Sequence, residues 1–306
     1  MGSILLGEIS APDIDRCLRG AGLGLQVGTF RCLVRSDTGC LAEPLRLLYR
    51  DYPAATSPEG FYDFRILLKK KRGNLWGGSK VEFEWAGHSP FPPLPLAQTH
   101  PLFEWGLNWC VATLSGCHTV IHSAVVERDG RALVMPGAPG SGKSTLCAAL
   151  ALAGWRLLSD ELTIVSQTSG AVEGVPRPIS LKDGSIDIIR SRFPAADLTQ
   201  PVVDTRKGTI AYVRPPLSAL EICASADKGI GHIVFPRFRA GAALTVEPIS
   251  HAMALAELLE NTFNVGLLGV DGFQSLAGVV AQAECYAVEY GDLSDVTAWI
   301  DTTCKP

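Results

Sequence analysis

The sequence predicts an α/β protein with a phosphate-binding loop in its C-terminal part and a small α+β domain before it. A short apolar segment, 131–136, precedes the loop, and an Ala- and Leu-rich helical segment, 146–153, follows it and ends at Gly154. A Pro-rich segment, 89–95, separates this part from an N-terminal region with alternating strand patterns. A chain of 306 residues with 47% hydrophobic content can form one large domain or two of ordinary size.

The N-terminal region, 1–95, has the pattern of a small α+β domain. Alternating segments predict strands over 23–35, 62–68 and 80–85, and a helix over about 41–49. Proline continues neither a helix nor a central strand, so we interpret 89–95 as a linker to a second domain that spans 96–306. The first domain carries no recognisable chemistry, and recruitment of a substrate is our hypothesis for it.

The C-terminal region shows helical and strand patterns in turn. A strand over 119–126, which contains His122, leads through a hairpin turn at 127–130 into the strand before the loop. Further elements are predicted as strands at 155–158, 162–165, 229–235, 243–248 and 285–290, and as helices at 102–114 and about 251–261, 272–283 and 293–302.

The most informative segment is a complete G-x-x-x-x-G-K-[ST] motif. Its glycines let the backbone turn tightly and present N–H groups to phosphate oxygens, and the following helix adds its positive N-terminal end. The Lys143 ammonium suits the β- and γ-phosphates, and the Ser144 hydroxyl suits magnesium. The sequence therefore predicts a site for ATP or GTP with Mg²⁺. The binding residues expected are Gly137, Ala138, Pro139, Gly140, Ser141, Gly142, Lys143, Ser144 and Thr145.

Composition argues against several classes of partner. The formal net charge is −4 and the only basic run is 69–72, so nucleic acid is not an expected partner. No apolar stretch approaches the length of a membrane span, and residues 1–8 lack the charged start and apolar core of a leader. The nine cysteines include no C-x-x-C pair and indicate reduced thiols, so we expect a cytoplasmic protein. Cys117, His118 and His122 lack a fourth ligand at zinc-like spacing.

An acidic pair, Asp160 and Glu161, follows a short apolar run only 17 residues after Lys143. An apolar environment with a lysine and a metal nearby turns a carboxylate into a ligand or a base with a shifted pKa. An exposed acidic turn between two strands is the alternative interpretation.

This arrangement resembles the C-terminal catalytic domain of the HPr kinase/phosphorylases, a family related to phosphoenolpyruvate carboxykinases. The resemblance rests on the strand with His122, 21 residues before Lys143, on the loop itself, and on the closely spaced acidic pair. It is strong over about 118–165 and weak over the rest of the C-terminal half. It implies an HPr kinase-like phosphate-loop domain with a mixed sheet.

The resemblance also implies residue roles. Asp160 stands where the family has the general base that acts on a serine hydroxyl. Glu161 stands where the family has a second aspartate, so Ser144, Asp160 and Glu161 become the candidate metal ligands. His122 corresponds to a histidine that positions phosphate or stabilises the loop. Without the resemblance, a lone histidine on a strand is better explained as a core residue.

Two departures from the family limit the analogy. The glycine-rich signature associated with the phosphorylase reaction is not visible after the acidic pair, where 172–184 stands, and the N-terminal region does not match the family's regulatory domain. The chain therefore resembles the HPr kinase-related kinases associated with peptide modification. Cations that could contact phosphate or substrate, or simply solvate a face, are Arg177, Lys182, Arg206 and Lys207.

These inferences lead to an expected function. We expect a Mg²⁺- and ATP-dependent kinase that transfers the γ-phosphoryl group to a hydroxyl, that of serine, on a small protein or peptide. Two alternatives remain open: a kinase for a small metabolite, which would need a compact closed pocket, and a nucleotide sensor or scaffold without transfer. A carboxykinase reaction is disfavoured because no additional His, Lys and Asp ligand set is apparent. The family's hexamers imply a homo-oligomer.

Overall fold

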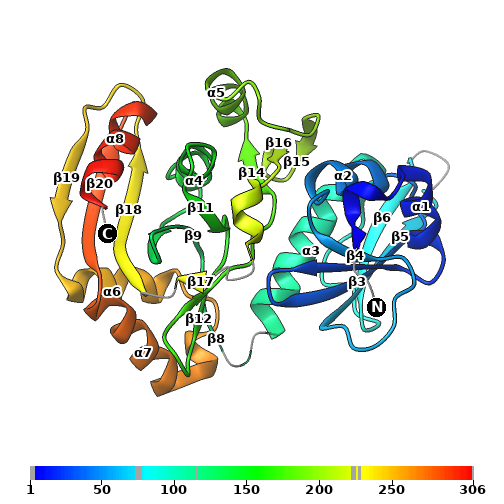
Figure 1. The fold of residues 1–306 in the computed structure, drawn as a ribbon, viewed down its shortest axis with the longest axis horizontal. Helices are drawn as coiled ribbons and strands as arrows, with labels where there is room; N and C mark the ends of the chain where they lie inside the picture. The colour runs from blue at the N-terminus through cyan, green and yellow to red at the C-terminus, as the bar shows by residue number, and fades with distance from the viewer. Residues whose placement is uncertain are drawn as a thin grey trace. The chain divides into compact units, whose positions relative to one another are not determined.

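The computed structural model describes residues 4–73, 78–114, 116, 118–221, 225–226 and 229–304. The chain forms two compact units, one of residues 1–111 and 197–214 and one of residues 112–196 and 215–306. Both combine helices with β-sheets, as labelled in Figure 1, so the predicted α/β class is confirmed. None of the helices in these described ranges is long and apolar enough to cross a bilayer.

The division between the units differs from the boundary expected at residue 95. Leu94–Pro95 forms strand β7, which pairs with β6 (Lys80–Trp85) in the first unit. The Phe91 ring lies 5.5 Å from Phe83 and 6.4 Å from Trp109. The Pro-rich segment is thus anchored in the first unit by its aromatic ring, and the border falls later, within helix α3 (Thr99–Leu114).

The first unit is built on a seven-stranded sheet. Its neighbours are antiparallel except for the parallel pair β3 and β5. The single strand expected over 23–35 is a hairpin, because Gly28 takes a positive φ of 59° between β2 and β3. The sheet order is β1 (Ile4–Leu5), β4 (Pro53–Ala55), β2 (Leu23–Val27), β3 (Phe30–Ser36), β5 (Phe64–Lys71), β6 and β7. The other elements are η1 (Leu6–Glu8), α1 (Ala11–Arg19), α2 (Ala42–Leu48), η2 (Leu96–Gln98), β15 (Val202–Thr205) and β16 (Gly208–Val213).

A buried polar network ties segment 197–214 to the first unit. The Tyr49 hydroxyl donates to the Glu104 carboxylate at 2.9 Å, and His100 Nε2 lies 3.1 Å from the same oxygen. The His100 ring meets the Tyr212 ring edge to face at 4.7 Å. Because buried carboxylates need such partners, this network explains why a charged side chain is tolerated in the core.

The second unit carries the phosphate loop on a six-stranded mixed sheet. The order is β11 (Arg156–Ser159), β9 (Ser123–Arg128), β10 (Arg131–Pro136), β18 (Ile230–Phe238), β20 (Glu284–Tyr290) and β19 (Thr245–Pro248). Strand β9 is antiparallel to both β11 and β10, and β18 and β20 are parallel to β10. The carboxyl ends of β11, β10, β18 and β20 therefore meet at one edge of the sheet.

The prediction of one continuous strand over 119–126 is wrong, because the strand is broken at His122. Strand β8 (His118–Ile121) joins a second, antiparallel sheet with β12 (Thr163–Ser166), β13 (Val172–Glu173) and β17 (Ser225–Ala226). The Asn264 side chain accepts from the Val120 N–H at 3.0 Å and donates to the His118 carbonyl at 2.8 Å. These bonds fix β8 in the second sheet, whereas β9 belongs to the six-stranded sheet. His122 therefore lies where the chain passes from one sheet to the other.

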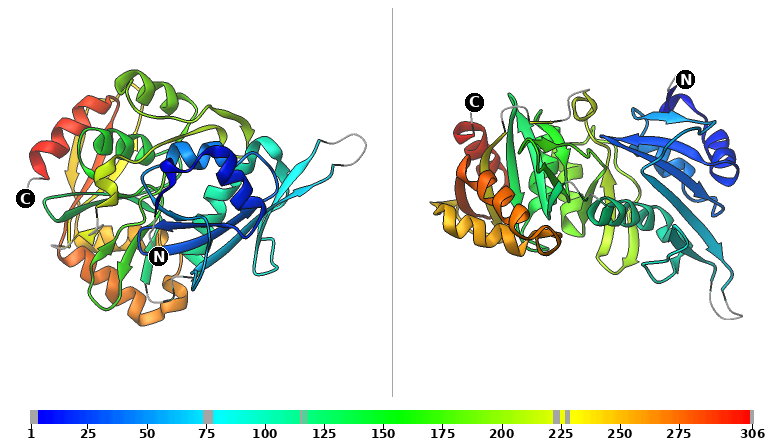
Figure 2. Two further views of the ribbon diagram at one scale, coloured as in Figure 1. Left: turned by 45° about the vertical axis from the view of Figure 1, so that its right-hand side comes forward. Right: turned by 90° about the horizontal axis from the view of Figure 1, so that it is seen from below.

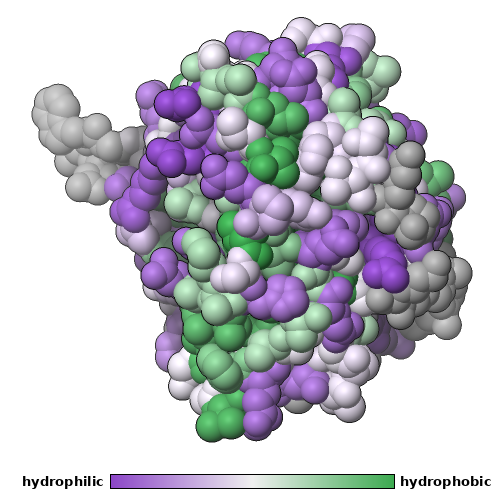
Figure 3. Space-filling view, turned by 90° about the vertical axis from the view of Figure 1, so that its left-hand side faces the viewer, coloured by the Kyte–Doolittle hydropathy of each residue, from purple (hydrophilic) through white to green (hydrophobic). Residues whose placement is uncertain are grey.

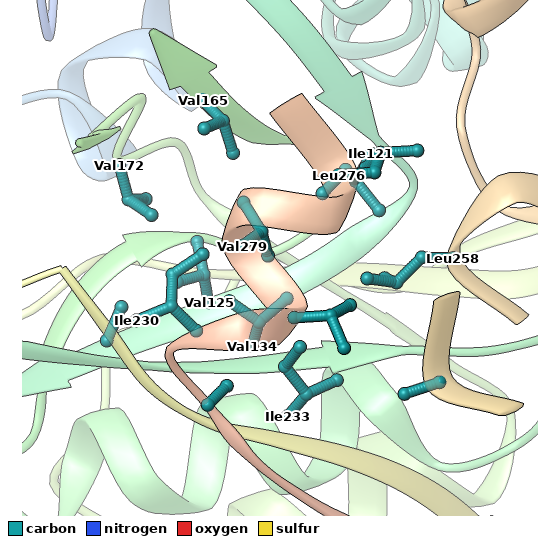
Figure 4. Close-up of a cluster of buried hydrophobic side chains, with 14 of the residues drawn as sticks. Ile121, Val125, Val134, Val165, Val172, Ile230, Ile233, Leu258, Leu276 and Val279 are labelled. Atoms are coloured by element: carbon teal, nitrogen blue, oxygen red, sulfur yellow. The ribbon is translucent and has the colours of Figure 1, made fainter. Parts of the chain in front are cut away.

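Helices α6 (His251–Glu260) and α7 (Val265–Ala281) pack on the six-stranded sheet, as both views of Figure 2 show. Figure 4 shows Leu276 of α7 beside Ile121, and Val279 of α7 near Val125 and Val134 of the central strands. Strand β10 is buried from Ala132 onwards, which is why its sequence is a continuous apolar run without alternation.

Most remaining predictions for the second unit are confirmed within a few residues. Helix α7 begins earlier than expected and contains a non-helical Gly269. Five elements among the described residues of this unit were not predicted: β13, β14 (Ile179–Lys182), α5 (Gly184–Arg192), the short η3 (Leu217–Leu220) and β17. Helices α4 (Lys143–Leu152) and α8 (Leu293–Thr303) occur where expected.

Candidate functional site

The phosphate loop connects the end of β10 to the start of α4. Gly137, Gly140 and Gly142 have positive φ angles of 145°, 88° and 94°, which a residue with a side chain adopts only at a cost. At Gly142 space is also limiting, because a Cβ there would lie 2.3 Å from the Tyr290 hydroxyl and 3.0 Å from Phe238 Cβ. The loop glycines are thus required by backbone conformation, and Gly142 also by a close approach.

Lys143 is held inside the loop. Its side chain is buried, and Nζ donates to the carbonyls of Gly137 and Ala138, the latter at 3.0 Å. Burial lowers the pKa of Lys143, and the charge of Asp160 acts in the opposite direction. An anion entering the loop would therefore meet a desolvated ammonium whose present partners are neutral carbonyls.

The rest of the loop offers further polar groups. Ala138, Pro139 and Gly140 form an exposed tip, whereas Ser141, Ser144 and Thr145 are half-buried. The Ser141 hydroxyl oxygen is buried without a hydrogen-bond partner in the part of the chain that the structure describes. A buried hydroxyl of this kind fits a site that completes its hydrogen bonds with a ligand.

Asp160 follows β11 at the same edge of the sheet as the loop. Its side chain is only 3% exposed, and Oδ2 accepts from the Ser180 N–H at 2.9 Å. Burial and the neighbouring Glu161 carboxylate raise the pKa of Asp160 to about 6. The Ser180 N–H, the Ser144 hydroxyl and the Arg177 guanidinium act in the opposite direction. Asp160 is therefore a carboxylate poised to take up a proton near neutral pH.

The acidic pair suits a magnesium ion. Asp160 Oδ1 is buried and has no hydrogen-bond partner among the described residues. Magnesium binds one or two carboxylates and a hydroxyl and takes its remaining ligands from phosphates and water. Asp160, Glu161 and Ser144 supply such oxygens. Within the described ranges, no group of three His, Cys, Asp or Glu side chains lies close enough together to hold a metal ion. Cys117, which the sequence analysis considered as a metal ligand together with His118 and His122, lies outside the described residues.

Glu161 is paired with one of the expected phosphate contacts. Arg177 Nη2 lies 3.6 Å from Glu161 Oε2, and the Arg177 side chain is 5% exposed. The structure thus places Arg177 against the acidic pair. Lys182, at the end of β14, acts electrostatically on Lys143 and lowers its pKa, so the two cations lie in one region.

Two other expected cations belong to the first unit. Arg206 and Lys207 form the turn between β15 and β16. Lys207 Nζ lies 5.4 Å from the centre of the Trp105 ring of the same unit, which is a cation–π contact. The structure does not bring either residue into the phosphate-loop unit.

His122 connects the acidic pair to the segment between α6 and α7. Its Nδ1 donates to the carbonyl of Glu161 at 3.2 Å, and its ring meets the Phe263 ring edge to face at 5.6 Å. Its backbone N–H donates to the Asn261 carbonyl at 2.6 Å. These contacts suit a residue that positions the backbone next to Asp160.

Sequence analysis missed the residues on the other side of the loop. The Phe238 N–H donates to the Ser141 carbonyl at 3.0 Å, and the Tyr290 hydroxyl donates to the Gly142 carbonyl at 3.4 Å. Both residues end apolar strands that the sequence does predict. The missing information was the pairing of these strands with β10, which places their carboxyl ends beside the loop.

No protein-family model matches this chain, and no curated protein matches it. The class that the fold itself defines is a mixed α/β protein with several mixed sheets, one of which carries the glycine-containing loop 137–142 at its carboxyl edge.

Proposed function

We propose that this chain is an ATP-dependent and Mg²⁺-dependent kinase of the HPr kinase-like type, which transfers the γ-phosphoryl group to a serine hydroxyl of a small protein or peptide. The observation that carries the proposal is the position of Asp160. A buried carboxylate with a raised pKa lies at the same sheet edge as the loop and interacts electrostatically with Lys143. Phosphoryl transfer needs charge neutralisation, alignment and a proton acceptor, and this edge offers all three.

The residues would divide these tasks. Lys143 would leave the loop carbonyls and balance charge on the β- and γ-phosphates. Asp160 would accept the proton of the acceptor hydroxyl. Bound Mg²⁺, held by Ser144 and the acidic pair, would supply charge neutralisation between phosphate oxygens. Arg177 and His122 would hold Glu161 by its side chain and its carbonyl.

A polypeptide acceptor is supported by an apolar surface on α6, α7 and the segment between them, which we call the α6–α7 surface. Its exposed side chains are Met253, Phe263, Leu267, Val270 and Phe273. Figure 3 shows apolar residues gathered over the lower part of this face. Such clusters mark interaction sites. The surface begins at Phe263, whose ring contacts His122 beside the acidic pair.

Charge favours a basic partner for the α6–α7 surface. Residues 240–304 contain no lysine or arginine, whereas Glu257, Glu260 and Asp271 are exposed on α6 and α7. We therefore expect an acceptor with Lys or Arg and bulky apolar side chains near its serine. A metabolite acceptor would not need such a surface. The seven described cysteines are all free, which supports the proposed cytoplasmic location.

Label transfer tests the proposed reaction. Incubation of the protein with γ-labelled ATP, Mg²⁺ and serine peptides that carry flanking Lys, Arg and apolar residues should label the peptides. Label in a small hydroxyl compound instead would identify a metabolite kinase. Tight ATP binding without any transfer would contradict the kinase and favour the nucleotide sensor or scaffold.

The double variant Leu267→Ser/Val270→Ser tests the acceptor surface. Loss of two exposed apolar contacts should raise the KM for peptide by about 10-fold and leave the KM for ATP unchanged. Ile188→Ser, an exposed apolar residue on α5, is the matched control. Sedimentation of both variants provides the second measurement. A changed oligomer mass with an unchanged peptide KM would assign the surface to a second copy of this chain.

A further inference from the structure

The carboxyl edge of the six-stranded sheet extends on both sides of the phosphate loop. On one side, β11 and its Asp160 lie beyond β9. On the other side, β18 and β20 end at Phe238 and Tyr290. In the proposed reaction the γ-phosphate must face Asp160, because the acceptor proton goes there. The nucleoside must then extend from the loop in the other direction, towards β18 and β20.

Phe238 lies directly against the loop on that side. Its N–H donates to the Ser141 carbonyl at 3.0 Å, so its backbone position is tied to the loop. Its side chain is 41% exposed. Its ring meets the buried Tyr290 ring edge to face, with centroids 5.7 Å apart and planes at 61°. The Phe238 ring is thus supported by Tyr290, while much of the Phe238 side chain is open to solvent.

We propose that Phe238 is the stacking platform for the base of the bound nucleotide. The inference rests on the proposed function, because it takes the direction of the triphosphate from the position of Asp160. Stacking on an aromatic ring tolerates any base, since every base has a π-face. The ligand class is thus a nucleoside triphosphate whose base is held mainly by stacking and not by hydrogen bonds.

A probe without a base separates this site from the phosphate loop. Isothermal titration with Mg·ATP and with Mg²⁺ and inorganic tripolyphosphate should be run on the wild type, Phe238→Ala, Phe238→Trp and the control Phe61→Ala, which removes an exposed ring of the first unit. Phe238→Ala should weaken ATP binding about 5- to 100-fold and tripolyphosphate binding less than about twofold. Phe238→Trp should restore ATP affinity, and Phe61→Ala should change the affinity for neither ligand.

Other results would overturn the inference. Equal weakening of both ligands by Phe238→Ala would mean that the residue only supports the loop. ATP affinity that is unchanged in Phe238→Ala, or wild-type affinity no higher for ATP than for tripolyphosphate, would place the base elsewhere while the proposed function stands. Failure of the wild type to bind either ligand would overturn both the inference and the proposed function. Equal melting temperatures of the four proteins would confirm that folding is intact.

Discussion

Asp160→Asn should abolish phosphoryl transfer and make the nucleotide-free protein more stable at neutral pH. Asparagine cannot accept the acceptor proton, so turnover should fall by at least about 10²-fold. It can still accept the Ser180 N–H through its carbonyl oxygen, and it removes a buried charge next to Glu161. A rise of about 1–3 kcal/mol in the free energy of unfolding at pH 8 is expected. Urea denaturation with a chelator present measures it.

The pH dependence of this gain follows from the pKa shift. The pKa of Asp160 is about 6 in the folded protein and near the ordinary aspartate value of 3.8 in the unfolded chain. Between these values the folded state binds more protons, so the contribution of this group to stability is full below about pH 4 and is lost as the pH rises through 6. The stability difference between Asp160→Asn and wild type should therefore be largest at pH 7–8 and vanish near pH 4.

An exposed acid provides the control. Asp187 on α5 has a side chain 86% exposed, so Asp187→Asn should change the unfolding free energy by less than about 0.5 kcal/mol at any of these pH values. Lower stability of Asp160→Asn than wild type at pH 8 would show that the carboxylate is structural. If Asp160→Asn transferred phosphate at the wild-type rate, Asp160 would not be the general base.

Lys143→Ala should eliminate nucleotide binding without unfolding the protein. The buried Lys143 ammonium donates to the carbonyls of Gly137 and Ala138 in the loop, so we expect its removal to destabilise the fold little and to weaken phosphate binding strongly. Mg·ATP at 100 times Kd should stabilise the wild type by about 3 kcal/mol and the variant not at all. Thermal unfolding with and without Mg·ATP is the measurement.

Lys69→Ala, at an exposed position on β5, is the control for Lys143→Ala and should keep the full stabilisation by nucleotide. If Lys143→Ala kept a wild-type shift, the loop would not be the triphosphate site. If Lys143→Ala failed to fold without ligand, the Lys143 side chain would be needed to stabilise the folded loop.

Local patterns predicted local structure well. The strand, loop and helix at 131–153 are confirmed because Gly137, Gly140 and Gly142 require positive φ and because β10 is buried on both faces. The hairpin before them is confirmed because Asp129 and Gly130 take the positive φ angles of a two-residue turn.

Predictions failed where distant partners compete with local pattern. The expected strand through His122 is broken because Asn261 and Asn264, far along the chain, take its backbone hydrogen bonds. The Pro-rich segment looked like a linker, yet Phe91 packs on rings of the first unit. In both cases a tertiary contact outweighs the local preference.

By itself, the sequence determined that a glycine-containing loop joins a strand to a helix, that Lys143 and Ser144 begin this helix, and that an acidic pair follows closely. Glycine positions and helix start signals act over a few residues, so they can be recognised without a fold. Only the tertiary structure decided which side chains share the loop's edge. The parallel pairing of β10, β18 and β20 brings Phe238 and Tyr290 to it, and burial among distant elements raises the pKa of Asp160. Strand pairing and desolvation depend on contacts between remote segments, which no local pattern encodes.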